Sequence, residues 1–73
     1  MKRVGEVSRV AQGLAIVRLP GEEHPNIGTA VIDENLDEVG RIVDVFGPVS
    51  NPYVAISSDR RPATLIGVKL YAR

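Results

Sequence analysis

Cysteine and tryptophan are absent from this 73-residue chain, and histidine occurs only once, at His24. Without cysteine the chain has no disulfide and no thiolate metal site. One imidazole with no cluster of further ligands around it does not predict a metal site either. We therefore expect neither a metal nor another cofactor, and no small-molecule ligand.

Long apolar runs are also missing. No stretch approaches the roughly 20 apolar residues that a membrane span requires. The N-terminal sequence MKRVGEVSRV is positively charged but has no apolar segment of the kind found in signal peptides. We therefore expect a cytoplasmic protein that does not bind a membrane.

Charge is balanced over the whole chain but unevenly distributed along it. Residues 1–20 carry four basic side chains against one acid, residues 21–44 carry seven acids against one arginine, and residues 45–73 are again basic. A strong basic footprint, typical of a protein that holds nucleic acid by itself, is missing. The three aromatic residues are too few and too scattered to predict a stacking platform for RNA. We expect contact with RNA to be mostly indirect.

Glycine and proline recur about every 8 to 12 residues, and valine and isoleucine dominate the runs between them. This pattern predicts an all-β protein. Gln12-Gly13 predicts a tight turn with Gly13 at positive φ. Six short strands leave exposed edges in an open sheet, and closing the sheet removes them. We therefore predict one domain over residues 1–73, a closed six-stranded antiparallel β-barrel with strands at residues 3–11, 14–19, 29–33, 38–46, 53–57 and 67–71.

Strict alternation along the fourth and fifth predicted strands separates two faces. It places Val39, Val43, Val45, Val54 and Ile56 on the face that fills the barrel. The opposite face then carries Gly40, Ile42, Asp44, Phe46, Tyr53, Ala55 and Ser57. On this pattern Phe46 and Tyr53 lean outward at one rim, joined by the turn at residues 47–52, unless a β-bulge at Gly47 turns Phe46 into the core.

No constellation of residues predicts catalysis, because the chain offers no nucleophile paired with a base. We read His24, in the polar segment GEEHPN, as a solvated loop residue. Asp44 lies inside a strand, where three roles are open: a catalytic acid, a cap of the following turn, or a pair with Arg41. We prefer the two structural roles, because no second catalytic group lies nearby in sequence. Gly40 in the middle of the same strand indicates a bulge or a close backbone approach. We expect no catalytic residue and no enzyme.

An acidic cluster and an arginine pair each have a structural and a functional interpretation. We interpret the acidic cluster as a solvated turn, and weak Mg²⁺ binding or a contact to a basic partner are the alternatives. The cluster comprises Asp33, Glu34, Asp37 and Glu38. Arg60 and Arg61 are a solvated loop pair or a contact to an RNA backbone. Two arginines alone predict weak, salt-sensitive binding.

The segment VDVFGPVSNPY, residues 43–53, combines two stiff dipeptides with two aromatic residues. Proline fixes its own φ and restricts the residue before it, so Gly47-Pro48 and Asn51-Pro52 make a rigid connection. Rigid apolar turns that carry aromatic side chains are favoured at protein interfaces. The residues alone leave a purely structural turn and a docking surface equally open.

The segment GRIVDVFGPVSNPYVAI, residues 40–56, resembles the signature of the Gar family, the small β-barrel subunit of H/ACA ribonucleoproteins. Upstream, RVGEVSRVAQGLAIVRL resembles the first hairpin of that family, and GTAVIDENLDEVG resembles the lead into the signature. The resemblance covers residues 4–56 and is weaker beyond. The chain lacks the glycine/arginine-rich tails of eukaryotic members, so the archaeal form is the closer match.

The resemblance implies a non-catalytic accessory subunit that binds the pseudouridine synthase of the particle. Its implied role is to engage the mobile thumb loop of the synthase, aiding substrate loading and product release in the modification of ribosomal RNA. The motif positions then become candidates for the synthase contact or its support: Phe46, Gly47, Pro48, Val49, Pro52 and Tyr53. A second hypothesis is a barrel of the ribosome-maturation or translation-factor type that binds a ribosomal protein or ribosomal RNA.

Overall fold

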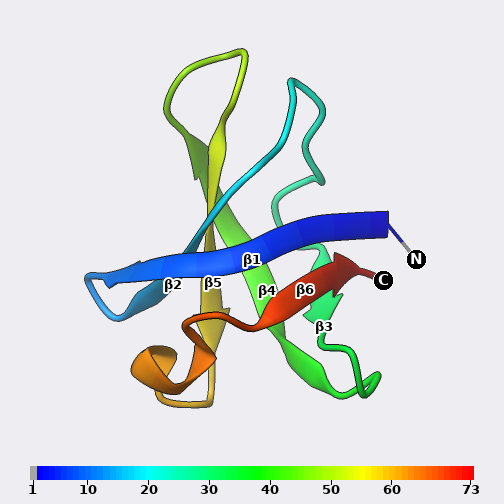
Figure 1. Cartoon of the computed structure of the whole chain (residues 1–73), viewed down its shortest axis with the longest axis vertical. Helices are drawn as coiled ribbons and strands as arrows, with labels where there is room; N and C mark the ends of the chain where they lie inside the picture. The colour runs from blue at the N-terminus through cyan, green and yellow to red at the C-terminus, as the bar shows by residue number, and fades with distance from the viewer. Residues whose placement is uncertain (1) are drawn as a thin grey trace.

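Six antiparallel strands close into a barrel in the computed structural model, which describes residues 2–73. The strands are β1 (Lys2–Ala11), β2 (Leu14–Arg18), β3 (Ala30–Ile32), β4 (Glu38–Phe46), β5 (Tyr53–Ser58) and β6 (Lys69–Ala72). Around the barrel they follow the order β1-β2-β5-β4-β3-β6 (Figure 1). β1 completes the closure, because its first half pairs with β6 and its second half with β2. The predicted closed six-stranded barrel is confirmed.

The strand boundaries differ from the predicted ones by at most two residues. The tight turn is also confirmed, with φ of 51° at Gln12 and 75° at Gly13. A 3-10 helix, η1 (Pro62–Leu65), occupies a segment that the sequence predicted only as a loop. Its Leu65 is buried and joins the barrel core. No helix in residues 2–73 is long and apolar enough to cross a membrane.

The barrel interior is filled almost entirely by aliphatic side chains, as the alternating pattern requires. Every strand contributes to it, and Leu65 adds a side chain from η1. The buried cluster comprises Val4, Val7, Ala15, Val17, Leu19, Val31, Val39, Ile42, Val54, Ile56, Leu65, Leu70 and Ala72.

Two irregularities in the pairing of β4 change which of its side chains face the core. Val39 is an extra residue of β4 in its register with β3. Val43 is an extra residue of β4 in its register with β5. Each bulge shifts the alternation by one position, so the second restores the phase that the first had changed.

Inside and outside are therefore exchanged between the two bulges. Ile42 is fully buried and Val43 is 40% exposed. The prediction that Val43 fills the barrel while Ile42 lies outside was wrong. The bulge that precedes Phe46 lies at Val43, not at Gly47.

Gly40 marks a close approach of two backbones, one of the two interpretations that its mid-strand position indicated. A Cβ atom at this position would overlap the carbonyl oxygen of Ser57 on the neighbouring β5. Only glycine lets β4 and β5 pair at this distance.

Candidate functional site

The turn between β4 and β5 stands at one end of the barrel beside the segment that joins β2 to β3 (Figure 1). Two hydrogen bonds tie the two segments together. The backbone N–H of Leu19 donates to the carbonyl oxygen of Pro52 at 2.9 Å. The side-chain amide of Asn51 donates to the carbonyl oxygen of Pro20 at 3.3 Å. The turn is thus held in place by the neighbouring segment as well as by its own prolines.

Phe46 and Tyr53 stack on each other at the base of this turn. Their ring centroids lie 5.6 Å apart, and the ring planes differ by 19°. The two residues are directly opposed partners across β4 and β5, so both side chains leave the sheet on its outer face. Phe46 is 38% exposed and Tyr53 is half-buried. The prediction that both rings share an outward rim is confirmed.

Gly47 and Pro52 support this aromatic pair. Gly47 has a φ of 91°, and a Cβ atom on it would lie 2.8 Å from Cδ2 of Tyr53. Pro52 is buried, and its carbonyl oxygen accepts the hydrogen bond from Leu19. Both residues therefore fix the position of the tyrosine ring and of the turn.

Pro48 and Val49 form the exposed tip of the turn. Val49 is 85% exposed, the most open of the large apolar side chains in residues 2–73. A shallow hollow of about 190 Å³ lies between this tip and the β2–β3 segment. Its walls include Phe46, Val49 and, from the other segment, Glu22 and His24. The tip thus offers apolar side chains to solvent beside a small depression.

Two arginines lie beside the aromatic pair, although the sequence analysis did not associate them with it. The guanidinium of Arg9, on β1, lies over the Tyr53 ring, 5.7 Å from its centroid. Arg18, on β2, is the directly opposed partner of Tyr53. Both neighbours come from strand pairing between distant parts of the chain, so no local pattern could have indicated them.

The acidic turn between β3 and β4 is organised by one buried carboxylate. Asp33 is 8% exposed, and its Oδ1 accepts hydrogen bonds from the backbone N–H groups of Asn35 at 2.8 Å and Asp37 at 3.1 Å. Its Oδ2 pairs with the guanidinium of Arg60 at 3.3 Å. Burial by itself raises the pKa of Asp33, but the N–H groups of Asp37 and Asn35, together with Arg60, outweigh this effect and hold that pKa below its ordinary value.

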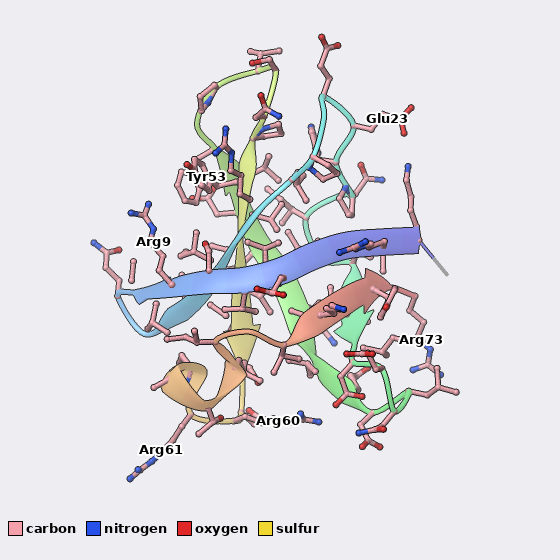
Figure 2. The ribbon with its side chains drawn as sticks, viewed as in Figure 1. Arg9, Glu23, Tyr53, Arg60, Arg61 and Arg73 are labelled. Carbon is pink, nitrogen blue, oxygen red and sulfur yellow. The ribbon has the colours of Figure 1, made fainter. Side chains whose placement is uncertain are left out.

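Arg60 and Arg61, the predicted candidates for RNA contact, lie at the opposite end of the barrel from Tyr53 (Figure 2). Arg60 is bound to Asp33 and also donates to the carbonyl oxygen of Glu38 at 3.5 Å. Arg61 is exposed. Their contact with RNA stays a prediction, but Arg60 has a structural role in joining the acidic turn to the end of β5.

His24 and Asp44 make only local contacts. His24 is exposed, and its Nδ1 lies 3.1 Å from the carbonyl oxygen of Pro25. The Asp44 carboxylate accepts a hydrogen bond from the N–H of Val45 at 2.8 Å, which is neither the turn cap nor the pair with Arg41 that the sequence suggested. Within the described part of the chain, no three His, Asp or Glu side chains gather where they could hold a metal ion.

Comparison with known proteins gives one family and two relatives. The model of the family described as the Gar1/Naf1 RNA binding region matches residues 1–72. An uncharacterized protein of Methanothermobacter thermautotrophicus is 33% identical over 61 residues, which are 82% of this chain and 64% of the relative. An uncharacterized protein of Methanocaldococcus jannaschii is 37% identical over 54 residues, which are 74% of this chain and 63% of the relative. The match thus spans slightly less than two thirds of each archaeal relative.

Proposed function

Because the chain belongs to the Gar1/Naf1 RNA-binding family, we propose that it is an accessory subunit of an H/ACA RNA-guided pseudouridylation particle. Membership of this family associates the chain with RNA and with ribonucleoproteins. The proposal goes further and names the direct partner, the pseudouridine synthase subunit. That partner carries out the conversion of uridine to pseudouridine in ribosomal RNA, and this chain contributes no catalytic residue.

The observation that carries the proposal is the rigid apolar surface of the β4–β5 turn. Phe46 and Val49 stay exposed there, although a barrel of this size gains stability from each apolar side chain that it buries. The turn loses little conformational entropy on binding, because two prolines and the hydrogen bonds to the β2–β3 segment already hold it. Exposed aromatic side chains on a pre-organised turn are typical anchors of protein interfaces.

From their burial and geometry we assign the motif residues two roles. Phe46, Pro48 and Val49 are exposed and form the contact. Gly47, which has no side chain to offer, and the buried Pro52 support that contact. Tyr53 does both, since its half-buried ring stacks on Phe46 and leaves its outer part accessible.

Binding to the synthase gives this subunit a way to act on turnover without chemistry of its own. If the barrel binds one state of the thumb loop more tightly than the other, it shifts the loop toward that state. A shift that favours the open loop assists substrate loading and product release. The size of the effect is limited by the difference between the two affinities.

The test is to titrate the synthase subunit and, separately, guide RNA into the full chain by isothermal titration calorimetry. We expect tight binding to the synthase and weak binding to free RNA. Phe46→Ala and Pro48→Asp should weaken the synthase complex by about 2 kcal/mol or more if both residues are interface anchors. Ile66→Ala is the matched control, because Ile66 is also apolar and 54% exposed but lies outside the turn.

Folded Phe46→Ala and Pro48→Asp proteins that bind as tightly as the parent would leave the motif a purely structural element. Co-sedimentation of the chain with ribosomal subunits, without any binding to the synthase, would support the ribosome-associated barrel instead.

A further inference from the structure

Phe46, Tyr53 and Arg18 form a row across the outside of the barrel. They are directly opposed partners on the adjacent strands β4, β5 and β2. Their chain neighbours Val17 and Val54 belong to the core, so the side chains of the row leave the sheet on the outer face. Arg9 of β1 extends the row, because its guanidinium lies over the Tyr53 ring (Figure 2).

We propose that Arg9 and Arg18 are the basic flank of the docking surface, and that the partner protein places carboxylates against them. This inference rests on the proposed function, in which Phe46 anchors the same surface. An arginine beside an exposed aromatic pair has the composition of an interface hot spot. Its planar guanidinium binds a carboxylate through two parallel hydrogen bonds while its face stays on the ring.

Two features of the surface favour a protein partner over a nucleic acid. Arg9 and Phe46 approach the Tyr53 ring from opposite sides of β5, so a nucleic-acid base would compete with both of them for stacking on that ring. The apolar tip at Val49 has no counterpart in a nucleic-acid backbone.

A negative charge lies on the side of the turn away from Arg9 and Arg18, and this asymmetry gives the partner a preferred orientation. Glu22 lines the hollow there, beside Phe46 and Val49. A partner that carries carboxylates is therefore attracted on the side of Arg9 and Arg18 and repelled on the side of Glu22. Complementary charge of this kind mainly affects the association rate and the specificity of a complex.

The experiment measures association of the full chain with the synthase subunit by surface plasmon resonance at low and at high salt. Arg9→Glu and Arg18→Glu should each raise the Kd on the order of tenfold at low salt, mainly through a slower association rate. The double variant should also lose most of the salt dependence of that rate. Arg18→Met, which keeps an apolar stem without the charge, should show a smaller effect of the same sign.

Lys69→Glu is the matched control, because it makes the same change of charge at an exposed position of β6, on the side of the barrel away from β5. It should bind as the parent does. If the Arg9 and Arg18 variants bind normally while Phe46→Ala does not, the inference fails and the proposed function stands. If Phe46→Ala also binds normally, the β4–β5 turn is not the docking surface. The proposed function itself fails only if the parent does not bind the synthase. If the double variant keeps its affinity for the synthase but loses affinity for guide RNA, the flank is an RNA contact and the inference is overturned.

Discussion

Gly47 lies so close to Tyr53 that a single added methyl group would strike the ring. A Cβ atom at Gly47 would lie 2.8 Å from Cδ2 of Tyr53, and the φ of 91° at Gly47 is unfavourable for any residue with a side chain. The glycine therefore sets the position of Tyr53, and through the ring stack it sets the position of Phe46. The exposed aromatic surface depends on the absence of one methyl group.

Gly47→Ala should destabilise the barrel by about 1–3 kcal/mol, the range expected for a strained backbone position. It should also weaken binding to the synthase, because the displaced Tyr53 ring no longer supports Phe46. Urea denaturation and calorimetry measure the two effects. Gly21→Ala is the control, since an added Cβ there meets no atom within 4 Å. If a folded Gly47→Ala protein bound the synthase normally, docking would not depend on the position of the Tyr53 ring.

The shifted alternation in β4 predicts opposite outcomes for two neighbouring residues. Ile42→Ala removes a fully buried side chain and should cost about 2–5 kcal/mol of unfolding free energy. Val43→Ala truncates a side chain that is 40% exposed and should cost less than about 1 kcal/mol. Equilibrium urea unfolding decides between them. A larger loss for Val43→Ala would restore the strict alternation and contradict the bulges.

Asp33 should make the stability of the barrel depend on acid. Its pKa is lower in the folded state than its ordinary value of 3.8, so its contribution is complete above that value. The contribution is lost as the pH falls through the lower, folded pKa, because the unfolded chain takes up the proton first. The urea midpoints of the parent and of Asp33→Asn should therefore differ at pH 7 and differ less at a pH below 3.8. The exposed neighbour variant Glu34→Gln is the control, and an equal gap at both pH values would show that the charge of Asp33 contributes nothing.

The strands and most of the core were predictable from sequence, and the exceptions have physical causes. Alternation placed Val54 and Ile56 inside, and turn residues located the hairpin at Gln12. The exchange of Ile42 and Val43 was not predictable, because both side chains are aliphatic and their alternation does not mark the position of a bulge. The outward rings followed from the same alternation, since the bulge at Val43 restores the phase before the strand ends.

The polar contacts around the site could not be predicted from the sequence, for a different reason. The pair between Asp33 and Arg60 and the approach of Arg9 to Tyr53 join residues that lie 27 and 44 positions apart. Such contacts exist only once the barrel closes, and no local spacing encodes them. The family resemblance indicated the segment at residues 43–53 that we propose as the docking surface, but it did not indicate the arginines beside it.

Guide-directed pseudouridylation, reconstituted with and without this chain, directly tests whether the chain is an accessory subunit of the particle. Under multiple-turnover conditions the parent protein should raise the rate of pseudouridine formation, while the rate of a single turnover changes less. Phe46→Ala should lose the acceleration and Ile66→Ala should keep it. Equal multiple-turnover rates with and without the folded chain, at concentrations that saturate its binding to the synthase, would show that the chain does not assist turnover.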